Sequence, residues 1–423
     1  MNRRAFLTRA GAVSLSAVMS DLMPARSLPA SLQSVVPTRL SASMWTYLWD
    51  VVDEGYDVII GRLKEHGLTS ISLATAYHAG KFLAPHNPKR KVVFPEDGTV
   101  YFAPRFHLYS RIRPRVSTLV QQGHGLTQLK KHADSAGLET RAWVVCCHNS
   151  ALGMEYPSCV CRDAFGDAIY HNLCPNNSDV RTYLGTLLRD IASEGVTTIE
   201  LEALQFQGYQ HEFHHEREGI PLTDGAKFLL GLCFCSSCME RATYHKVAIE
   251  EIQKYTRTTL ERYFENPEAF AETLASPTAF PSDLFDPFLE WRRTSVLSLA
   301  EDMMNGIYPM KTRLRPIVSL DPAAQQMAGV DPGAVAAVTG GILTTGYVKD
   351  GTALRDPLTA MQTKIGQNKL TVGFQVGLPE SGGKEEFASR MKTARELGIT
   401  SFNFYNYGMI PLSHLEWVKE SLQ

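Results

Sequence analysis

The sequence has 423 residues, and 42 Lys and Arg side chains nearly balance 44 Asp and Glu, which leaves a formal net charge of −2. A surface without strong positive charge excludes nucleic acid and an anionic membrane as main partners. No segment beyond the N-terminus is apolar over the about 20 residues that a membrane span needs. The length fits one large barrel domain with insertions.

The first 30 residues have the features of an export signal. Arg3 and Arg4 precede Ala-Phe-Leu, the pattern of a twin-arginine leader, and a modest apolar stretch over residues 10–23 leads to small residues near Ala30. We expect residues 1–30 to be a twin-arginine signal peptide and the mature protein to be periplasmic or secreted. A disordered basic N-terminus is the alternative.

Residues 31–423 alternate short apolar segments with helical patterns, which is typical of parallel α/β proteins. Eight strands, each followed by a helix, are what a closed barrel requires, whereas an open doubly wound sheet usually has about six. The sequence therefore predicts an α/β fold, a single-domain (β/α)8 TIM barrel. The expected strands are Leu40–Trp45, Ser70–Tyr77, Thr140–Cys147, Thr197–Leu204, Arg313–Leu320, Ile342–Val348, Leu370–Gly377 and Ser401–Tyr405.

Two aspartate–proline pairs mark expected helix starts. Asp331-Pro332 and Asp356-Pro357 each offer a side-chain cap followed by a proline, whose missing N–H is not needed in the first helical turn. Each pair therefore predicts that a helix begins at its proline.

Two connections are much longer than a strand-to-helix loop needs: residues 79–123 after the second strand and residues 205–309 after the fourth. The first contains Val92–Phe94 and Val100–Phe102, which we expect to form a hairpin. The second carries a cysteine cluster and two helical stretches. Both follow strand C-termini and should cover the face where barrel enzymes bind ligands. Insertions that form an oligomer interface are the alternative.

The fourth strand carries two carboxylates on one face, because Glu200 and Glu202 are two residues apart. Carboxylates directed into a barrel need partners or a chemical task. Glu202, nearer the C-terminal end, is the expected general acid/base, and Glu200 lies one layer deeper as its partner. A salt-bridged pair inside the barrel is the alternative.

Polar and aromatic residues collect at the other expected strand ends. Imidazole, amide and phenol groups around a ring suit the recognition of sugar hydroxyls, and Trp45 with Tyr47 and Trp49 could form a stacking platform. The candidate substrate-binding residues are Trp45, Tyr77, His78, His148, Asn149, Gln205, His211, Gln375, Asn403, Tyr405 and Asn406.

The histidines also permit a catalytic metal. His148, Glu202 and one of His211, His214 or His215 could bind a divalent ion, as in sugar isomerases built on barrels. The alternative is that the charged segment around these three histidines is simply solvated.

Three thiols lie within six residues, at Cys233, Cys235 and Cys238. Three thiolates need a fourth ligand to complete a structural zinc site, and Cys174 is the favoured one. Outside the cytoplasm the alternative is disulfides, for example between Cys161 and the cluster. We expect structural zinc and no organic cofactor.

Cys-x-Cys-x-x-Cys after a strand-four glutamate resembles the zinc cluster of family 42 β-galactosidases and related barrel glycosidases. The segment from Leu173 to Glu202 is similar to the turn and helix before strand four in glycosyl-hydrolase-like barrels. The resemblance covers mainly residues 140–240 and implies a barrel glycosidase. It also implies a glutamate nucleophile at the end of strand seven. This sequence has Gln375 there and Glu380 on the following loop.

The expected function is that of an exported glycoside hydrolase acting on a sugar or polysaccharide fragment. The second catalytic carboxylate would be Glu380, Asp350 or Asp321. A carboxyl separation of about 5 Å would give retention of configuration and one of about 6.5–9.5 Å inversion. The alternatives are a metal-dependent sugar isomerase, epimerase or lyase, and a non-catalytic glycan-binding barrel that has lost its nucleophile.

Overall fold

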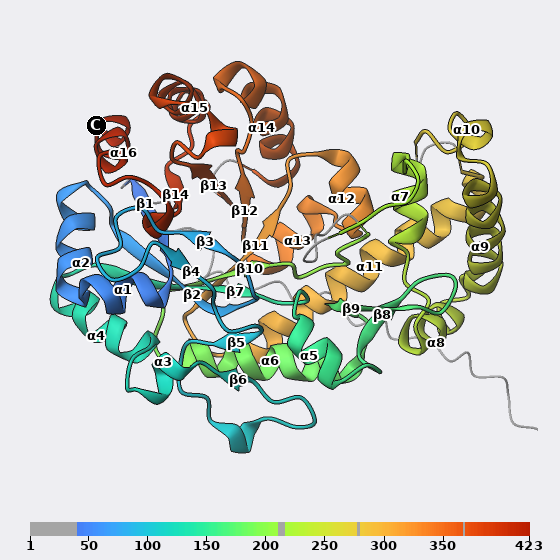
Figure 1. Ribbon diagram of the computed structural model, residues 1–423, viewed down its shortest axis with the longest axis horizontal. Helices are drawn as coiled ribbons and strands as arrows, with labels where there is room; N and C mark the ends of the chain where they lie inside the picture. Colours follow the sequence, from blue (N-terminus) through green and yellow to red (C-terminus); the bar gives the residue numbers. More distant parts are fainter. Residues whose placement is uncertain (1–39, 210–215, 277–279, 367–368) are drawn as a thin grey trace, which may run out of the picture. The chain divides into compact units, whose positions relative to one another are not determined.

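The computed structural model describes residues 40–423, apart from residues 210–215, 277–279 and 367–368 and the side chain of Glu380 (Figure 1). The expected signal peptide lies outside the described residues. The described residues from 40 onward belong to one compact unit. No helix in the described part of the chain is long and apolar enough to cross a bilayer.

Eight parallel strands form a closed barrel, because β1 pairs with both β2 and β14. The predicted α/β fold and TIM barrel are therefore confirmed, and each expected strand overlaps an observed one. The barrel strands are β1 (Ser41–Thr46), β2 (Ser70–Tyr77), β7 (Glu139–Val145), β10 (Thr198–Glu202), β11 (Arg313–Val318), β12 (Ile342–Thr345), β13 (Leu370–Gln375) and β14 (Ser401–Tyr405).

Helices pack around the barrel and cover its outer face (Figure 1). Helix α6 shows why: Val180, Leu184, Leu187 and Ile191 recur at helical spacing and are all buried. The helices outside the two insertions are α1 (Leu48–Glu54), α2 (Tyr56–Glu65), α4 (Leu126–Ser135), α5 (Ser150–Glu155), α6 (Ser178–Ser193), α12 (Pro322–Ala328), α13 (Pro332–Thr339), α14 (Gly351–Ile365), α15 (Lys384–Glu396) and α16 (His414–Leu422).

One of the two aspartate–proline predictions is confirmed and the other is wrong. Asp331 caps α13, and its side chain accepts hydrogen bonds from the N–H groups of Gly333 and Ala334. Helix α14 instead begins at Gly351, capped by Asp350, and Pro357 lies inside it. The Asp350 cap starts the helix before Asp356 is reached, and the helix then continues through Pro357.

The insertion after β2 contains β3 (Phe82–Leu83), β4 (Val92–Val93), β5 (Thr99–Val100), a 3₁₀ turn (Phe106–Leu108), β6 (Arg115–Val116) and α3 (Thr118–Gln121). The expected hairpin is wrong, because β4 pairs with β3 while β5 pairs with the end of β2. Gly98 has φ +63° and contacts the Asn149 side chain, where a Cβ atom would be 2.2 Å from Oδ1. This turn directs β5 onto the barrel.

A small hairpin between β7 and α6 has no counterpart in the sequence-based prediction. It consists of β8 (Val160–Arg162) and β9 (Ala168–Leu173), which pair antiparallel. Helix α5 packs closely on β9, because Gly153 lies against the Tyr170 carbonyl.

The insertion after β10 is helical, as expected. It contains α7 (Asp224–Leu230), α8 (Ser236–Tyr244), α9 (Ile249–Glu265), α10 (Pro267–Phe270) and the long α11 (Ser282–Ile307). Helix α11 returns to the barrel and packs on α6 and α13, whereas α9 lies on the outer side of the insertion (Figure 1).

Candidate active site and cysteine cluster

Glu202 is the last residue of β10 and lies at the C-terminal mouth of the barrel, where its side chain is half-buried. Its Oε2 accepts a hydrogen bond of 2.6 Å from Nε1 of Trp143, on the neighbouring strand β7. Burial raises the pKa of Glu202, although His78 and the Trp143 hydrogen bond act in the opposite direction. A carboxyl with a raised pKa at the barrel mouth is suited to general acid chemistry.

Glu200 lies deeper and is 1% exposed. Its Oε2 accepts hydrogen bonds from Trp45 Nε1 at 2.6 Å and Ser72 Oγ at 2.7 Å, and Arg141 lies 3.7 Å from Oε1. Burial raises the pKa of Glu200, and Arg141 and these hydrogen bonds partly offset the rise. Its partners and its burial give Glu200 a structural place inside the barrel, which agrees with the salt-bridge alternative rather than with direct contact to a substrate.

Aromatic rings surround Trp143 at the mouth. The ring centroids of Tyr77, Tyr47 and Tyr405 lie 4.9, 5.7 and 6.0 Å from that of Trp143. The Tyr47 hydroxyl is 3.2 Å from that of Tyr77 and 3.1 Å from that of Tyr405. Three phenol groups joined through their hydroxyls therefore surround Trp143, the hydrogen-bond donor to Glu202. The carboxylate of Glu202 also contributes to the raised pKa of Tyr77.

The expected stacking platform is wrong. Trp45, Tyr47 and Trp49 are 2%, 1% and 3% exposed, because Tyr47 stacks on Trp49 at 4.3 Å and Trp45 bonds to Glu200 inside the barrel. These rings support the floor of the mouth and do not present an open face to a sugar.

Three histidines form one wall of the mouth. The His78 ring stacks between Tyr77 at 4.4 Å and His148 at 4.5 Å, and His171 lies 5.7 Å from His148. The sequence placed His78 and His148 here, but His171 reaches the wall from β9, which no local pattern had indicated.

Several candidate polar side chains bond to nearby backbone instead of facing the mouth. Asn149 caps α5 through Leu152 N, and the Asn406 side chain accepts from Gly408 N. Asp350 and Asp321 cap α14 and α12, each accepting from two backbone N–H groups. These caps give all four side chains a structural role.

The remaining candidates divide between the mouth and segments outside the described residues. Gln375 ends β13 opposite Tyr405 and is half-buried, and Gln205 follows β10. Asn403 is fully buried on β14, inside the barrel. His211, His214, His215 and the side chain of Glu380 lie outside the described residues.

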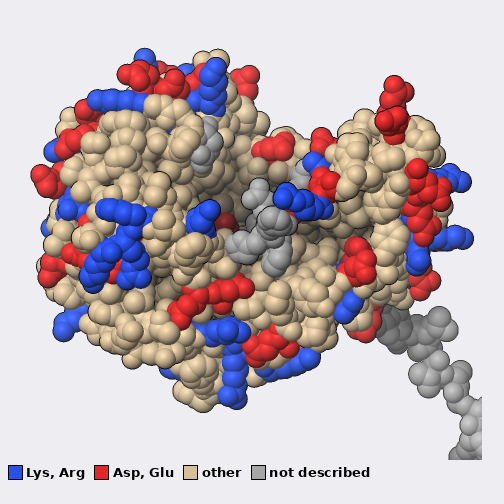
Figure 2. Space-filling view, in the orientation of Figure 1, with Lys and Arg blue, Asp and Glu red and all other residues tan. Residues whose placement is uncertain are grey.

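The surface is hollowed between the barrel and the helical insertion (Figure 2). A separate groove of about 500 Å³ lies between α15 and α16, where Phe387, Met391 and Trp417 line it. That groove contains none of the candidate residues.

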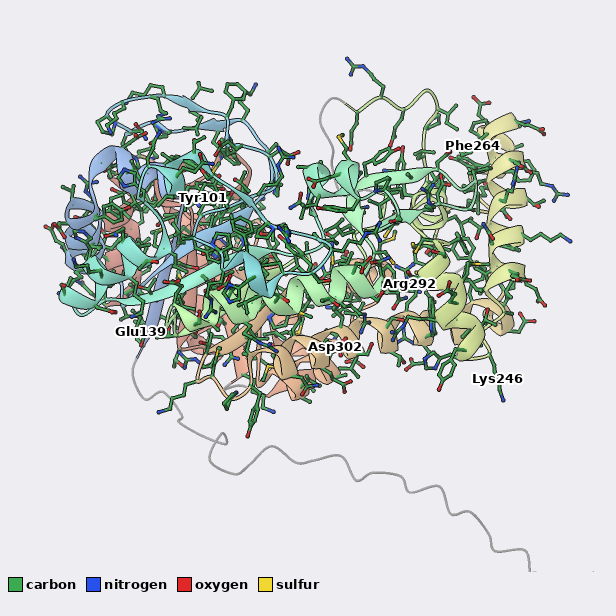
Figure 3. All side chains as sticks on the ribbon, turned by 90° about the horizontal axis from the view of Figure 1, so that it is seen from below. Tyr101, Glu139, Lys246, Phe264, Arg292 and Asp302 are labelled. Atoms are coloured by element: carbon green, nitrogen blue, oxygen red, sulfur yellow. The ribbon has the colours of Figure 1, made fainter. Side chains whose placement is uncertain are left out.

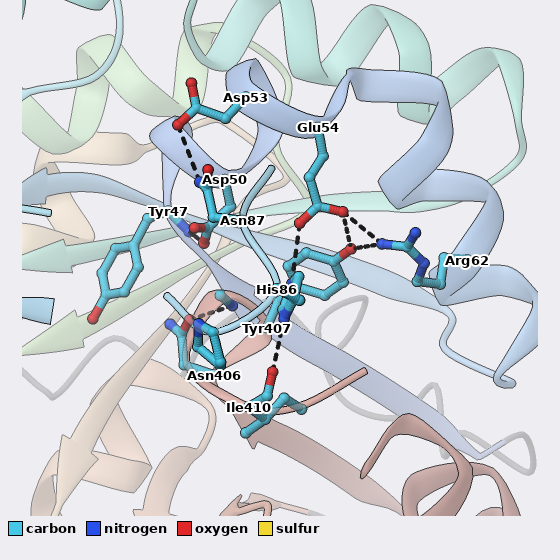
Figure 4. Close-up of polar contacts among 12 residues, drawn as sticks. Tyr47, Asp50, Asp53, Glu54, Arg62, His86, Asn87, Asn406, Tyr407 and Ile410 are labelled. Atoms are coloured by element: carbon cyan, nitrogen blue, oxygen red, sulfur yellow. Dashed lines mark hydrogen bonds and ion pairs between the residues drawn. The ribbon is translucent and has the colours of Figure 1, made fainter. Parts of the chain in front are cut away.

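A buried ionic network fixes the first insertion to the barrel (Figure 4). Glu54 Oε1 is 3.0 Å from His86 Nε2, and Glu54 Oε2 accepts from Arg62 at 2.6 Å and from the Tyr407 hydroxyl at 2.9 Å. The His86 ring also contacts the Ile410 carbonyl at 2.7 Å. Burial opposes the charge of Glu54, but these hydrogen bonds outweigh it and lower the pKa of Glu54.

Asp50, on the same helix as Glu54, is 1% exposed and accepts a hydrogen bond from Tyr47 N. Burial raises the pKa of Asp50 to about 8, with Glu54 and Asp53 acting in the same direction. At neutral pH this carboxyl therefore holds its proton.

Four buried thiols could hold a metal ion: Cys174, Cys233, Cys235 and Cys238, whose sulfur atoms all lie within 4.8 Å of one another. Cys174 Sγ is 3.5 Å from Cys238 Sγ and 3.4 Å from Cys235 Sγ. Sulfurs about 2.3 Å from one tetrahedral ion are about 3.8 Å apart, so the cluster fits a single ion. All eight cysteines are free thiols in the structure.

The surroundings of the cluster suit negatively charged sulfur. Asn176 donates to Cys174 Sγ through its backbone N–H at 3.4 Å and to Cys238 Sγ through its side chain at 3.5 Å. Arg292, on α11 of the helical insertion (Figure 3), is buried, and its guanidinium interacts electrostatically with the thiols. No other group of His, Cys, Asp and Glu suited to a metal ion occurs among the described residues.

Comparison with known proteins rests on structure alone. No family model matches the sequence, and none of the curated proteins matches it. The glycoside hydrolase domain of PgaB (BpsB) from Bordetella bronchiseptica matches with a TM-score of 0.54 and 13% identity, over 90% of this chain and 99% of that chain. This likeness shows that the two chains share the (β/α)8 barrel fold. A β-galactosidase from the psychrophilic Marinomonas ef1 matches with a TM-score of 0.50 and 8% identity, over 90% of this chain and 59% of that one.

Proposed function

We propose that this chain is an exported glycoside hydrolase that acts on a sugar or polysaccharide fragment, with Glu202 as its general acid/base. The observation that carries the proposal is the place of Glu202, half-buried at the barrel mouth with a raised pKa and a 2.6 Å hydrogen bond from Trp143. Barrel enzymes bind their ligands at this face.

In this mechanism the protonated Glu202 gives its proton to the leaving glycosidic oxygen. Trp143 Nε1–H then stabilises the carboxylate that forms, because its hydrogen bond to Oε2 is stronger when the acceptor is charged. Tyr405, Gln375 and His148 surround the mouth and supply donors and acceptors for sugar hydroxyls.

A second carboxylate would complete the usual pair. Asp350 accepts two backbone hydrogen bonds through Oδ1, and Asp321 accepts one through each of its oxygens. Both carboxylates are engaged in helix caps, which makes them poor nucleophiles. Glu380 therefore becomes the favoured partner, on the loop that follows β13.

The test is hydrolysis of aryl glycosides and natural oligosaccharides by the mature protein and by Glu202→Gln. The variant should lose about 10²-fold or more of kcat, because it cannot give up a proton. Glu139→Gln is the matched control, since Glu139 begins β7 at the opposite end of the barrel and is exposed. Equal activity of Glu202→Gln and the parent would remove Glu202 from this role.

A non-catalytic glycan-binding barrel is the second candidate. The observation that favours it is Gln375, which ends β13 where the resemblance implies a glutamate nucleophile. Glycan binding measured by calorimetry, with no sugar released from any substrate and no effect of Glu202→Gln on affinity, would favour this function.

For the cysteine cluster we propose structural zinc. Four thiolates leave no open position on a tetrahedral ion, so the metal would stabilise the fold and take no part in the reaction. One zinc per chain should be found by elemental analysis. A Cys238→Ser variant should bind it less tightly, and a wild-type protein without metal would contradict the proposal.

A further inference from the structure

The cysteine cluster and the barrel mouth share one short strand, β9. Cys174 directly follows this strand, and His171, three residues earlier, lies in the histidine wall. An extended residue spans about 3.3 Å, so His171 and Cys174 are separated by about 10 Å of chain. A contact that fixes Cys174 therefore also restrains His171.

β9 also holds the segment that carries His148. The Asn149 N–H donates to the His171 carbonyl at 3.0 Å, and the Leu173 N–H donates to the Cys147 carbonyl at 2.8 Å. His148 lies between these two bonds as an isolated bridge partner of Asn172. The position of His148, and with it the stack on His78, thus depends on β9.

The opposite side of β9 fixes the start of the second long insertion. The buried Asn172 side chain donates to the Gly208 carbonyl at 3.2 Å. The hairpin partner of β9 is β8, only three residues long, so β9 is held mainly by α5, which packs on it, and by its hydrogen bonds to residues 147–149. A further anchor at Cys174 would hold these parts of the mouth in register.

We propose that a metal ion bound by the four thiols is this anchor, and that it positions His171 and His148 for substrate binding. The ion would join Cys174 at the end of β9 to Cys235 and Cys238 at the start of α8, which ties the end of the strand to the helical insertion. His171 is then a positioning residue that acts through His148. The effect on substrate rests on the glycan-directed function proposed above, whereas the ordering of β9 does not.

Hydrogen exchange of the full chain with and without metal tests the anchor directly. Removal of zinc by a chelator, confirmed by elemental analysis, should speed exchange about tenfold or more in residues 168–174 and 147–149. The barrel strands β12, β13 and β14 should keep their protection. Cys238→Ser gives the same comparison if chelation is slow. Unchanged exchange in β9, or an equal rise in the barrel strands, would overturn the proposal.

Kinetics of His171 variants test the link to the mouth. His171→Ala should keep its zinc but raise KM for the glycan about threefold to tenfold with little change in kcat, because the site is disordered before binding. His171→Phe, which keeps a ring against His148, should restore most of the affinity, and the exposed His107→Ala is the control. A fall in kcat alone, or no rescue by the ring, would overturn the positioning role. If no glycan is hydrolysed, the exchange experiment still decides the anchor.

Discussion

At the residue scale, burial, His78 and the Trp143 hydrogen bond together set the proton affinity of Glu202. Burial raises the pKa of this carboxyl, while the indole N–H favours its charged form and limits the rise. Trp143 lies on β7, one strand away, and the sequence did not single it out. The alternation of Arg141, Trp143 and Val145 toward the barrel interior is the signal that could have found it.

Trp143→Phe should raise the pKa of Glu202 further, because it removes a donor to the carboxylate. A general acid works while it is protonated, so the alkaline limb of the profile of kcat/KM against pH should move to higher pH. The profile of Trp417→Phe, a change on α16 away from the mouth, should stay in place. An alkaline limb that stays or moves to lower pH in Trp143→Phe would contradict this assignment.

Asp50→Asn should stabilise the protein at neutral pH. The folded pKa of Asp50 is about 8 and the unfolded one about 3.9, so between these values only the folded state holds the proton. Stability from this group is complete below about pH 4 and falls as pH rises toward 8. The variant should gain up to about 4 kcal/mol at pH 7 and nothing near pH 4. Thermal unfolding of both proteins across this range measures the difference, and an equal gain at both pH values would refute the cause.

At the element scale, caps decide where helices begin. Asp350 fixes the start of α14 by accepting from Thr352 N and Ala353 N, so Pro357 falls in the helix interior. The sequence contained both the Asp350 cap and the Asp356-Pro357 pair, but it could not show which of them marks the start of the helix. The capping side chain prevails because it satisfies two backbone donors, whereas the proline only fixes one φ angle.

Asp350→Ala should cost about 1 kcal/mol of unfolding free energy through the lost cap, with hydrolysis changed less than about twofold. Asp356→Ala, at an exposed position inside α14, should cost nothing measurable. Denaturant titration of the two variants compares them. A loss of about 10²-fold in kcat for Asp350→Ala would return this residue to catalysis.

At the scale of the whole molecule, we expect the first 30 residues to direct export of the folded protein. Arg3→Lys with Arg4→Lys should keep the protein in the cytoplasm, because the twin-arginine route depends on both guanidinium groups. Fractionation of cells that express the two forms measures this. Equal amounts outside the cytoplasm would show that another signal is used.

The sequence by itself determined the barrel, the order of its strands and the position of Glu202, although five expected strands extend past the observed ends. Apolar segments of strand length, each followed by an amphipathic helix, leave few other ways to bury their surfaces, and strand alternation places Glu202 at the mouth. The spacing of Cys233, Cys235 and Cys238 also predicted three thiols of one site, and the structure adds Cys174, the favoured fourth ligand. These features depend on local periodicity or on chemistry within a few residues.

Only the tertiary structure decided which polar groups face the mouth. Trp45 is drawn inside by Glu200, Asn149 turns to cap α5, and His171 arrives from a hairpin that sequence patterns did not reveal. Each of these outcomes depends on partners tens of residues away or on competition between nearby bonds. A buried side chain takes the orientation in which its polar atoms find hydrogen-bond partners. Those partners come from distant parts of the fold, so the orientation cannot be predicted from the neighbouring residues in the chain.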